Sequence, residues 1–243
     1  MTTLFVSDVH LSASRPAIVS RFIGFLGGEA RKSDALYILG DLFDEWLGDD
    51  DDRPPHAEII DALRDFSASG TPLYVMPGNH DFLLGDRFAS MSGCRLLGDE
   101  AVVDLYGTRV LLMHGDSLCT LDTDYQAFRK LSRDPDVQRQ VLELSLKARE
   151  ARAAEIRGLS RSAMRLKTEE IMDVTPAAVA ETMGRHGVTH FIHGHTHRPA
   201  VHDMQLRGES GKRIVLGDWY DQDSVLRWSA GGFRLGRLGD PGC

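Results

Sequence analysis

The chain has 243 residues, 42% of them hydrophobic, and a formal net charge of −8. Its length and composition allow one large domain with a full core, and its acidity disfavours a general nucleic-acid binder, because phosphate backbones need a basic surface. The three cysteines show no paired spacing, which disfavours a disulfide framework and favours a reducing compartment.

The first part of the chain alternates strand and helix patterns. Short apolar segments at 3–7, 35–39 and 72–76 are typical of buried strands. Between them, residues 17–30 and 56–69 carry apolar side chains at the three-to-four spacing of amphipathic helices. This alternation predicts βαβαβ units. The chain enters its first strand at once, so we expect no signal peptide, and no apolar stretch reaches the length of a membrane span.

Further strand patterns follow in the second part. They lie at residues 101–104, 109–113, 189–192, 213–216 and 224–228. Tyr106-Gly107 between the first two reads as a hairpin turn, and the later strands look more antiparallel. We therefore predict an α/β fold, a layered α/β/β/α sandwich with mixed sheets, whose ligands bind on loops at the carboxyl ends of strands.

The stretch between residues 122 and 170 shows no strand pattern and reads mostly as helix, with a break expected at Asp134-Pro135. Tyr125, Phe128 and Leu131 begin its apolar pattern. Residues 129–170 contain eleven Lys or Arg against seven Asp or Glu. Two interpretations are open: a solvated helical hairpin, or a cap whose apolar face and basic edge meet an amphiphilic anion or a membrane surface. The acidic run 49–52 is interpreted as a solvated loop rather than a metal site.

Five short motifs each follow an apolar strand segment. They are Asp8-x-His10, Gly40-Asp41, Gly78-Asn79-His80-Asp81, His114-Gly115-Asp116 and 193–197, which reads His-Gly-His-Thr-His. One such motif would mean little, but five together are typical of a two-metal site for phosphoester hydrolysis, in which a carboxylate such as that of Asp41 bridges the ions. The mixture of His with oxygen ligands suits Mn²⁺, Fe or Zn²⁺ better than Ca²⁺. An extended Asp8-Val9-His10 would point both side chains to one side.

These motifs resemble the calcineurin-like metallophosphoesterase superfamily. Longer stretches narrow the resemblance to the UDP-2,3-diacylglucosamine diphosphatase family, which acts in lipid A biosynthesis in Gram-negative bacteria; they are residues 7–11, 37–46, 78–85, 111–120, 171–174, 193–199 and 215–219. The resemblance implies a metallophosphoesterase core, residues 1–121 and 169–243, with a helical cap inserted at 122–168. It also implies a cytoplasmic hydrolase, peripherally bound to the inner membrane, that needs no nucleic acid and no obligate protein partner.

The resemblance also implies a ligand set for two Mn²⁺ ions. The first ion takes Asp8, His10, Asp41 and His197. The second takes Asp41, Asn79, His114 and His195. Water activated by both ions then attacks the UMP-side phosphorus of UDP-2,3-diacylglucosamine, which releases UMP and 2,3-diacylglucosamine 1-phosphate.

Catalytic and substrate-binding roles are implied for further residues. Asn79, His80 and Asp81 are the expected catalytic group, with Asp81 fixing the tautomer of His80, as Asp116 does for His114, while His193 orients its loop. Substrate contacts are expected at Asn79, His80, Asp122, Tyr125, Arg157, Ser160, Met164, Lys167 and His195. This chain departs from the family pattern twice, with His80 in place of the usual Arg and Met164 in place of a residue that is commonly Asn.

Three alternative functions remain. A hydrolase of another nucleotide diphosphate is disfavoured by the apolar face of the cap. The acidic charge disfavours a metal-dependent nuclease. The intact ligand set disfavours a non-catalytic scaffold of the same fold.

Overall fold

Two mixed β-sheets stack face to face in the computed structural model, which describes residues 1–164, 167–206 and 208–240 and the side chains of all of these except 161–164. The first sheet has the order β11 (Gly232–Arg237), β10 (Ser224–Ser229), β1 (Thr3–Val6), β2 (Ala35–Leu39), β3 (Leu73–Met76), β4 (Arg95–Leu96). The second has the order β5 (Ala101–Leu105), β6 (Thr108–Leu112), β7 (His190–His193), β9 (Glu209–Val215), β8 (Ala200–Leu206).

The centre of each sheet is parallel. Strands β1 to β4 pair in parallel, as do β6, β7 and β9. Antiparallel strands flank them: β10 and β11 in the first sheet, β5 and β8 in the second. Parallel neighbours present their carboxyl ends at one edge of a sheet, and the predicted motifs follow β1, β2, β3, β6 and β7 there.

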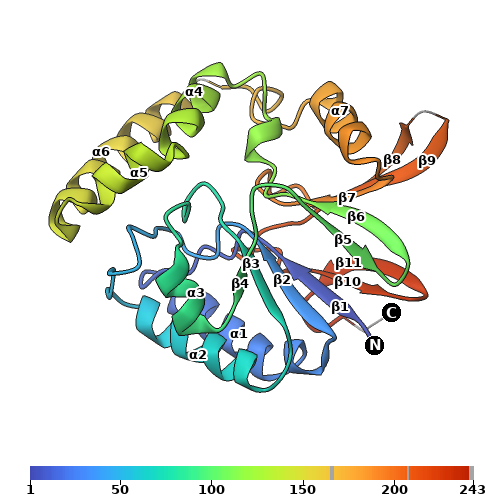
Figure 1. The fold of residues 1–243 in the computed structure, drawn as a ribbon, viewed down its shortest axis with the longest axis horizontal. Helices are drawn as coiled ribbons and strands as arrows, with labels where there is room; N and C mark the ends of the chain where they lie inside the picture. Colours follow the sequence, from blue (N-terminus) through green and yellow to red (C-terminus); the bar gives the residue numbers. More distant parts are fainter. Residues whose placement is uncertain (165–166, 207, 241–243) are drawn as a thin grey trace.

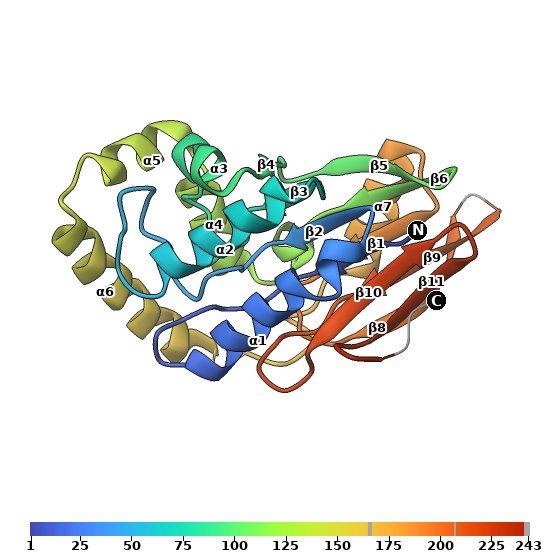
Figure 2. The same cartoon turned by 90° about the horizontal axis from the view of Figure 1, so that it is seen from below.

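Alternating side chains divide the core into layers. Leu4 and Val6 of β1 pack on the helical side, while Phe5 packs between the sheets. Helices α1 (Pro16–Gly27), α2 (His56–Ala68) and α3 (Asp86–Ser92) cover the first sheet, and α7 (Pro176–His186) covers the second (Figures 1 and 2). The predicted α/β/β/α sandwich is confirmed.

Every predicted strand and helix segment of the two layers is found, and the turn at Tyr106-Gly107 joins β5 to β6. Among the described residues, the prediction missed β4, β8, β11, α3, α7 and two short 3-10 helices, η1 (Ala30–Lys32) and η2 (Asp116–Leu118). Polar residues interrupt the apolar ones in β8 and β11, and α3 is only 7 residues long. Such segments give too weak an apolar periodicity to be recognised.

Three helices lie beyond the sandwich, between η2 (Asp116–Leu118) and α7. They are α4 (Thr123–Ser132), α5 (Pro135–Leu142) and α6 (Leu146–Met164), and they project together from one end of the molecule (Figures 1 and 2). The break at Asp134-Pro135 is confirmed: the Asp134 carboxylate accepts hydrogen bonds from two backbone N–H groups at the start of α5. These helices fall within residues 122–168, the predicted cap. That boundary itself stays a prediction.

Arginines fasten the cap to the sandwich. Arg149 is only 3% exposed and donates to the carbonyl of Leu47 and the carboxylate of Asp50. On α4, Arg129 pairs with Asp116 at 2.7 Å, and Arg133 donates to the carbonyl of Gly78 at 2.9 Å. Part of the local basic excess thus holds the cap against the loops that carry the motifs.

The acidic run 49–52 is only in part the solvated loop that the sequence suggested: Asp50 and Asp52 are exposed, but Asp49 and Asp51 are not. Asp49 accepts hydrogen bonds from Gly85 N and Phe88 N at the start of α3. Asp51 is 3% exposed and accepts a 2.7 Å hydrogen bond from Arg53 Nε. Asp49 thus stabilises the start of α3, and Asp51 positions the side chain of Arg53. No helix among the described residues is both long and apolar enough to cross a membrane.

Candidate metal centre

Most of the predicted ligands have a left-handed backbone. The φ angle is 53° at Asp8, 51° at His10, 52° at Asp41, 66° at His195 and 54° at His197. The prediction of an extended Asp8-Val9-His10 is therefore wrong, because β1 ends at Val6, before this motif. A non-glycine residue in this region costs roughly 1–2 kcal/mol, a strain that concentrates at functional sites.

Two glycines allow the loops to approach one another closely. A Cβ atom at Gly40 would lie 2.2 Å from Nδ1 of His114, and one at Gly78 would lie 2.1 Å from Oδ1 of Asp41. Both distances are far below a van der Waals contact, so any side chain at either position would displace a predicted ligand. The glycine that precedes Asp41 and the one that precedes Asn79 are thus structural requirements of the site.

Asp8, His10 and His197 form one group whose ligand atoms all lie within 4.8 Å of one another. His197 Nε2 lies 3.2 Å from Asp8 Oδ1 and 3.4 Å from His10 Nε2. Oδ1 of Asp8 is buried, and no described residue donates a hydrogen bond to it. A buried acceptor that faces two imidazole nitrogens fits a divalent cation.

A second group surrounds the Asn79 side chain. Its Oδ1 lies 2.9 Å both from His114 Nε2 and from His195 Nδ1. Asp41 lies between the two groups, because its Oδ2 is 3.6 Å from His114 Nε2 and 3.7 Å from His10 Nε2. The structure thus brings all seven predicted ligands together, with Asp41 where a bridging carboxylate belongs.

The electrostatics of the site favour ionised carboxylates. Burial raises the pKa of Asp8, but the close contact with His197 and the charges of neighbouring histidines outweigh it, and the net pKa lies below its usual range. The pKa of Asp41 is lowered in the same way, with His114 the largest opposing influence. Burial, helped by the charge of His114, lowers the pKa of His195 to about 4, which leaves that ring neutral and able to coordinate a metal.

Groups behind the ligands orient their rings. His114 Nδ1 lies 2.9 Å from the carbonyl oxygen of Leu39, and His197 Nδ1 lies 3.4 Å from Asp218. Such partners fix which ring nitrogen faces the metal. The prediction that Asp116 orients His114 is wrong, because Asp116 accepts hydrogen bonds from α4 instead.

His193 is fully buried, and its Nδ1 lies 2.9 Å from the carbonyl oxygen of Gly194 within the motif loop. Burial lowers its pKa to about 3, so the ring is neutral. The contact is local to the loop that carries His195 and His197, as expected for a residue that orients this loop.

Asp81 does not hold the His80 ring. It accepts hydrogen bonds from the backbone N–H groups of Leu42 (2.8 Å) and Gly78 (2.6 Å), which ties two motif loops together. Instead, Nδ1 of His80 lies 2.8 Å from the carbonyl oxygen of Asp44. The predicted tautomer-fixing contact is therefore wrong for this pair, and Asp81 acts on the backbone.

The cap brings some predicted substrate contacts to the metal centre. Tyr125 donates to Asp116 at 2.6 Å, and its ring centroid lies 6.0 Å from that of His195. Lys167, predicted to meet phosphate, forms an ion pair with Asp122 at 2.7 Å.

The remaining predicted contacts lie on α6. Arg157, also predicted to meet phosphate, pairs with Glu45. Ser160 is exposed, and the side chain of Met164 lies outside the described residues.

Sequence reasoning missed an aromatic wall beside His10. The Tyr220 ring stacks on the His10 ring at 5.1 Å between centroids, and the Arg15 guanidinium lies over the other face of Tyr220 at 3.9 Å. Asp218, which contacts His197, was missed as a partner of that ligand. The sequence feature that could have revealed Asp218 is a carboxylate that closely follows the predicted strand 213–216. The stretch 215–219 was used only for the family resemblance.

The sequence matches the calcineurin-like phosphoesterase family over residues 1–199. The chain belongs to this family. The phosphoesterase is 51% identical over 235 residues to the UDP-2,3-diacylglucosamine hydrolase of Aeromonas hydrophila, which covers 97% of this chain and 98% of that protein. It is also 51% identical over 245 residues to the protein of the same name from Stenotrophomonas maltophilia, with 98% and 99% covered. The resemblance found in the sequence is confirmed.

Solved structures support the fold alone. Yfce, a phosphoesterase from E. coli, superposes with a TM-score of 0.50 at 16% identity and covers 99% of this chain and 94% of its own. Vacuolar Protein Sorting 29 from Cryptosporidium parvum gives a TM-score of 0.51 at 13% identity, with 98% and 92% covered.

The position of Asp41 between the two groups predicts the effect of its removal on metal content. Asp41→Ala should lose both ions, because they share this carboxylate, whereas His197→Ala should mainly weaken one. Metal analysis by mass spectrometry after dialysis measures the number of ions bound per protein chain. Two ions retained by folded Asp41→Ala protein would exclude the bridging role.

Proposed function

We propose that this phosphoesterase hydrolyses the pyrophosphate bond of UDP-2,3-diacylglucosamine to UMP and 2,3-diacylglucosamine 1-phosphate, in lipid A biosynthesis. The observation that carries the proposal is the placement of Asp41 between two histidine groups, which suits a two-ion phosphoester site. The choice of substrate rests on the near-full-length relatives, which are named UDP-2,3-diacylglucosamine hydrolase.

The residues present fit two Mn²⁺ ions. Asp8, His10 and His197 would hold one ion, and Asn79, His114 and His195 the other, with Asp41 shared. When bound, such ions supply a nucleophile at neutral pH and charge to offset that of the phosphoryl oxygens. The mixed imidazole and oxygen ligands suit Mn²⁺ better than Ca²⁺.

His80 is proposed to stabilise the transition state and to protonate the leaving oxygen. Its Nδ1 is held by the carbonyl of Asp44, and its backbone N–H donates to Asp41 at 2.8 Å, so the ring is fixed beside the bridging carboxylate. A carbonyl acceptor requires a proton on Nδ1, which leaves Nε2 as the atom that exchanges a proton with the substrate. Asp81 supports this arrangement by holding the loop that carries His80.

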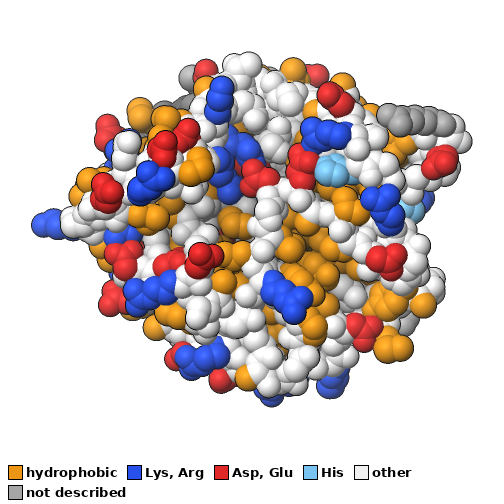
Figure 3. Space-filling model, viewed as in Figure 1, with side chains coloured by type: hydrophobic (Ala, Val, Ile, Leu, Met, Phe, Trp, Pro, Cys, Tyr) orange, Lys and Arg blue, Asp and Glu red, His pale blue; other side chains and the backbone are white. Residues whose placement is uncertain are grey.

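The cap is proposed to bind the lipid part of the substrate and the inner-membrane surface. Leu131, Leu142, Leu144 and Leu159 are exposed on or beside its helices, and Figure 3 shows hydrophobic side chains among charged ones over this part of the molecule. Tyr125 on α4 lies beside His195, so the cap extends from the exposed leucines, where the lipid would bind, to the predicted metal ligands. This surface would place a cytoplasmic enzyme peripherally on the membrane that holds its substrate.

The phosphate groups of the substrate are proposed to displace the carboxylates that pair with Lys167 and Arg157. Lys167 and Arg157 are held by Asp122 and Glu45, and a phosphate can take up either cation while the freed carboxylate turns to a sugar or uridine hydroxyl. If these cations hold the sugar-linked phosphate, the UMP-side phosphorus lies over Asp41. Water then attacks that phosphorus, and the lipid phosphate leaves.

Acyl-chain dependence tests the substrate. Each buried methylene contributes about 0.8 kcal/mol, so shortening the two acyl chains should raise KM steeply, and UDP-N-acetylglucosamine should be hydrolysed with far lower kcat/KM. Release of UMP measured by chromatography checks this, with slow cleavage of bis(p-nitrophenyl) phosphate as the control for an intact site. Equal kcat/KM for diacylated and water-soluble substrates would contradict the proposal.

Substitution of His80 tests its role. His80→Ala should lower kcat by about 10²–10⁴-fold, the usual range for general acid catalysis, with both ions retained. His80→Arg should keep appreciable activity, since it restores the usual residue of the family. His186→Ala, a surface histidine paired with Glu100, should change nothing. An unchanged kcat in His80→Ala protein would make His80 a spectator.

A further inference from the structure

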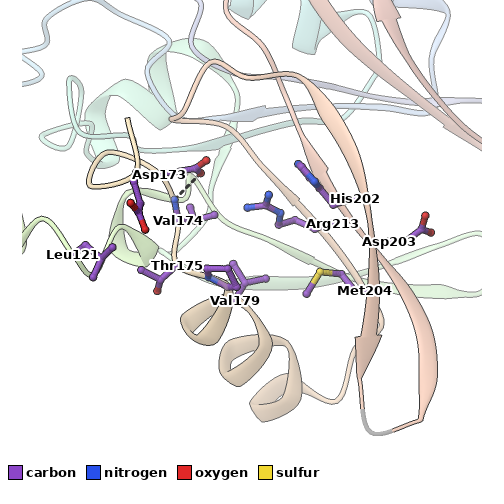
Figure 4. Close-up of a pocket in the computed structure, with 11 residues that line it drawn as sticks. Leu121, Asp173, Val174, Thr175, Val179, His202, Asp203, Met204 and Arg213 are labelled. Atoms are coloured by element: carbon purple, nitrogen blue, oxygen red, sulfur yellow. Dashed lines mark hydrogen bonds between the residues drawn. The ribbon is translucent and has the colours of Figure 1, made fainter. Parts of the chain in front are cut away.

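A cavity of about 450 Å³ lies on the outer face of the second sheet, and no predicted metal ligand lines it. Its lining includes Leu121, which precedes the cap, and residues 173–175, which follow it (Figure 4). The cavity thus sits at the root of the cap, where both connections to the core meet. The proposed hydrolysis assigns no role to it.

Two basic side chains form its floor. Arg213 of β9 and His202 of β8 are directly opposite in the antiparallel register, so both project from the same face of the sheet. Arg213 is half-buried, and its guanidinium makes no hydrogen bond and no ion pair with any residue of the described part of the chain. Burial lowers the pKa of Arg213, and burial together with the charge of Arg213 lowers that of His202.

Three acidic residues line the cavity. Glu170 is exposed to solvent, and the other two, Asp173 and Asp203, have partners of their own. Asp173 accepts a hydrogen bond from Val174 N at 2.7 Å and pairs with Arg198 at 3.2 Å. Asp203 pairs with Lys212 and points away from the cavity in Figure 4. Asp173 therefore only partly offsets the charge of Arg213. A half-buried guanidinium in this situation gains from an anionic ligand, because its five N–H donors match phosphate or carboxylate oxygens.

Apolar side chains complete the walls. Val174 and Val179 face Met204 across the cavity, and Leu121 borders it (Figure 4). A fully polar ion would leave these walls in contact with water. We propose that the cavity binds an anionic amphiphile, with a phosphate or carboxylate head at Arg213 and His202 and a short apolar chain along Val179 and Met204. The ligand would touch both segments that join the cap to the core.

Hydrogen–deuterium exchange on the metal-loaded protein tests the proposal with octyl phosphate as the probe. Octyl phosphate should slow exchange in residues 174–183 and 200–206, apart from any effect at the metal loops. Arg213→Gln should raise the octyl phosphate concentration needed for half-maximal protection at least tenfold. His202→Gln should raise it less. Arg109→Gln is the matched control: Arg109 is an exposed arginine of β6 whose guanidinium donates to the backbone carbonyls of residues 186 and 187, and its loss should leave the protection unchanged.

Two further probes separate the head from the chain. Inorganic phosphate and octyl glucoside should each protect these segments at least tenfold less well than octyl phosphate. Equal protection by inorganic phosphate would contradict the role of the apolar walls, and equal protection by octyl glucoside would contradict that of Arg213. The proposal is overturned if octyl phosphate protects only the metal loops, or if folded Arg213→Gln protein binds it as well as the parent. Neither result would affect the proposed hydrolysis, which is measured separately by UMP release.

Discussion

Two buried carboxylates, Asp8 and Asp41, are the constraint on which the rest of the structure depends. Burying a charge is costly unless partners or a cation compensate it. Here the compensation comes from His10, His114 and His197. They belong to three motifs, which can meet only if their strands end at the same edge. Left-handed backbone at the ligands and glycines at the close approaches follow from this convergence.

The motifs predicted the site well because strand ends and metal-ligand chemistry are local properties of the sequence. The conformation of the ligands was not predictable, since Asp8 and His10 adopt φ values that few non-glycine residues adopt. The partners of Asp81 and Asp116 were also mistaken. Both carboxylates bind groups from distant segments, and sequence proximity to a histidine does not show which buried donor a carboxylate satisfies.

The fold was predictable where apolar periodicity was strong and not where it is interrupted, as in β8 by His202, Asp203 and Gln205. The helical character of the cap could be recognised, but its attachment could not. Arg149 is buried because it binds the carbonyl of Leu47, about a hundred residues earlier, and nothing in the composition of α6 distinguishes it from exposed arginines. The same attachment holds the cap in place, and Tyr125 of the cap lies beside the metal centre.

In the proposed reaction, a water molecule attacks the UMP-side phosphorus, which is held over Asp41. In-line attack places the oxygen of water on the phosphorus that is struck. Hydrolysis of UDP-2,3-diacylglucosamine in ¹⁸O-water, with both products weighed by mass spectrometry, measures this directly. Attack on the UMP-side phosphorus would place one ¹⁸O atom in UMP and none in 2,3-diacylglucosamine 1-phosphate. Label in the lipid phosphate would contradict it.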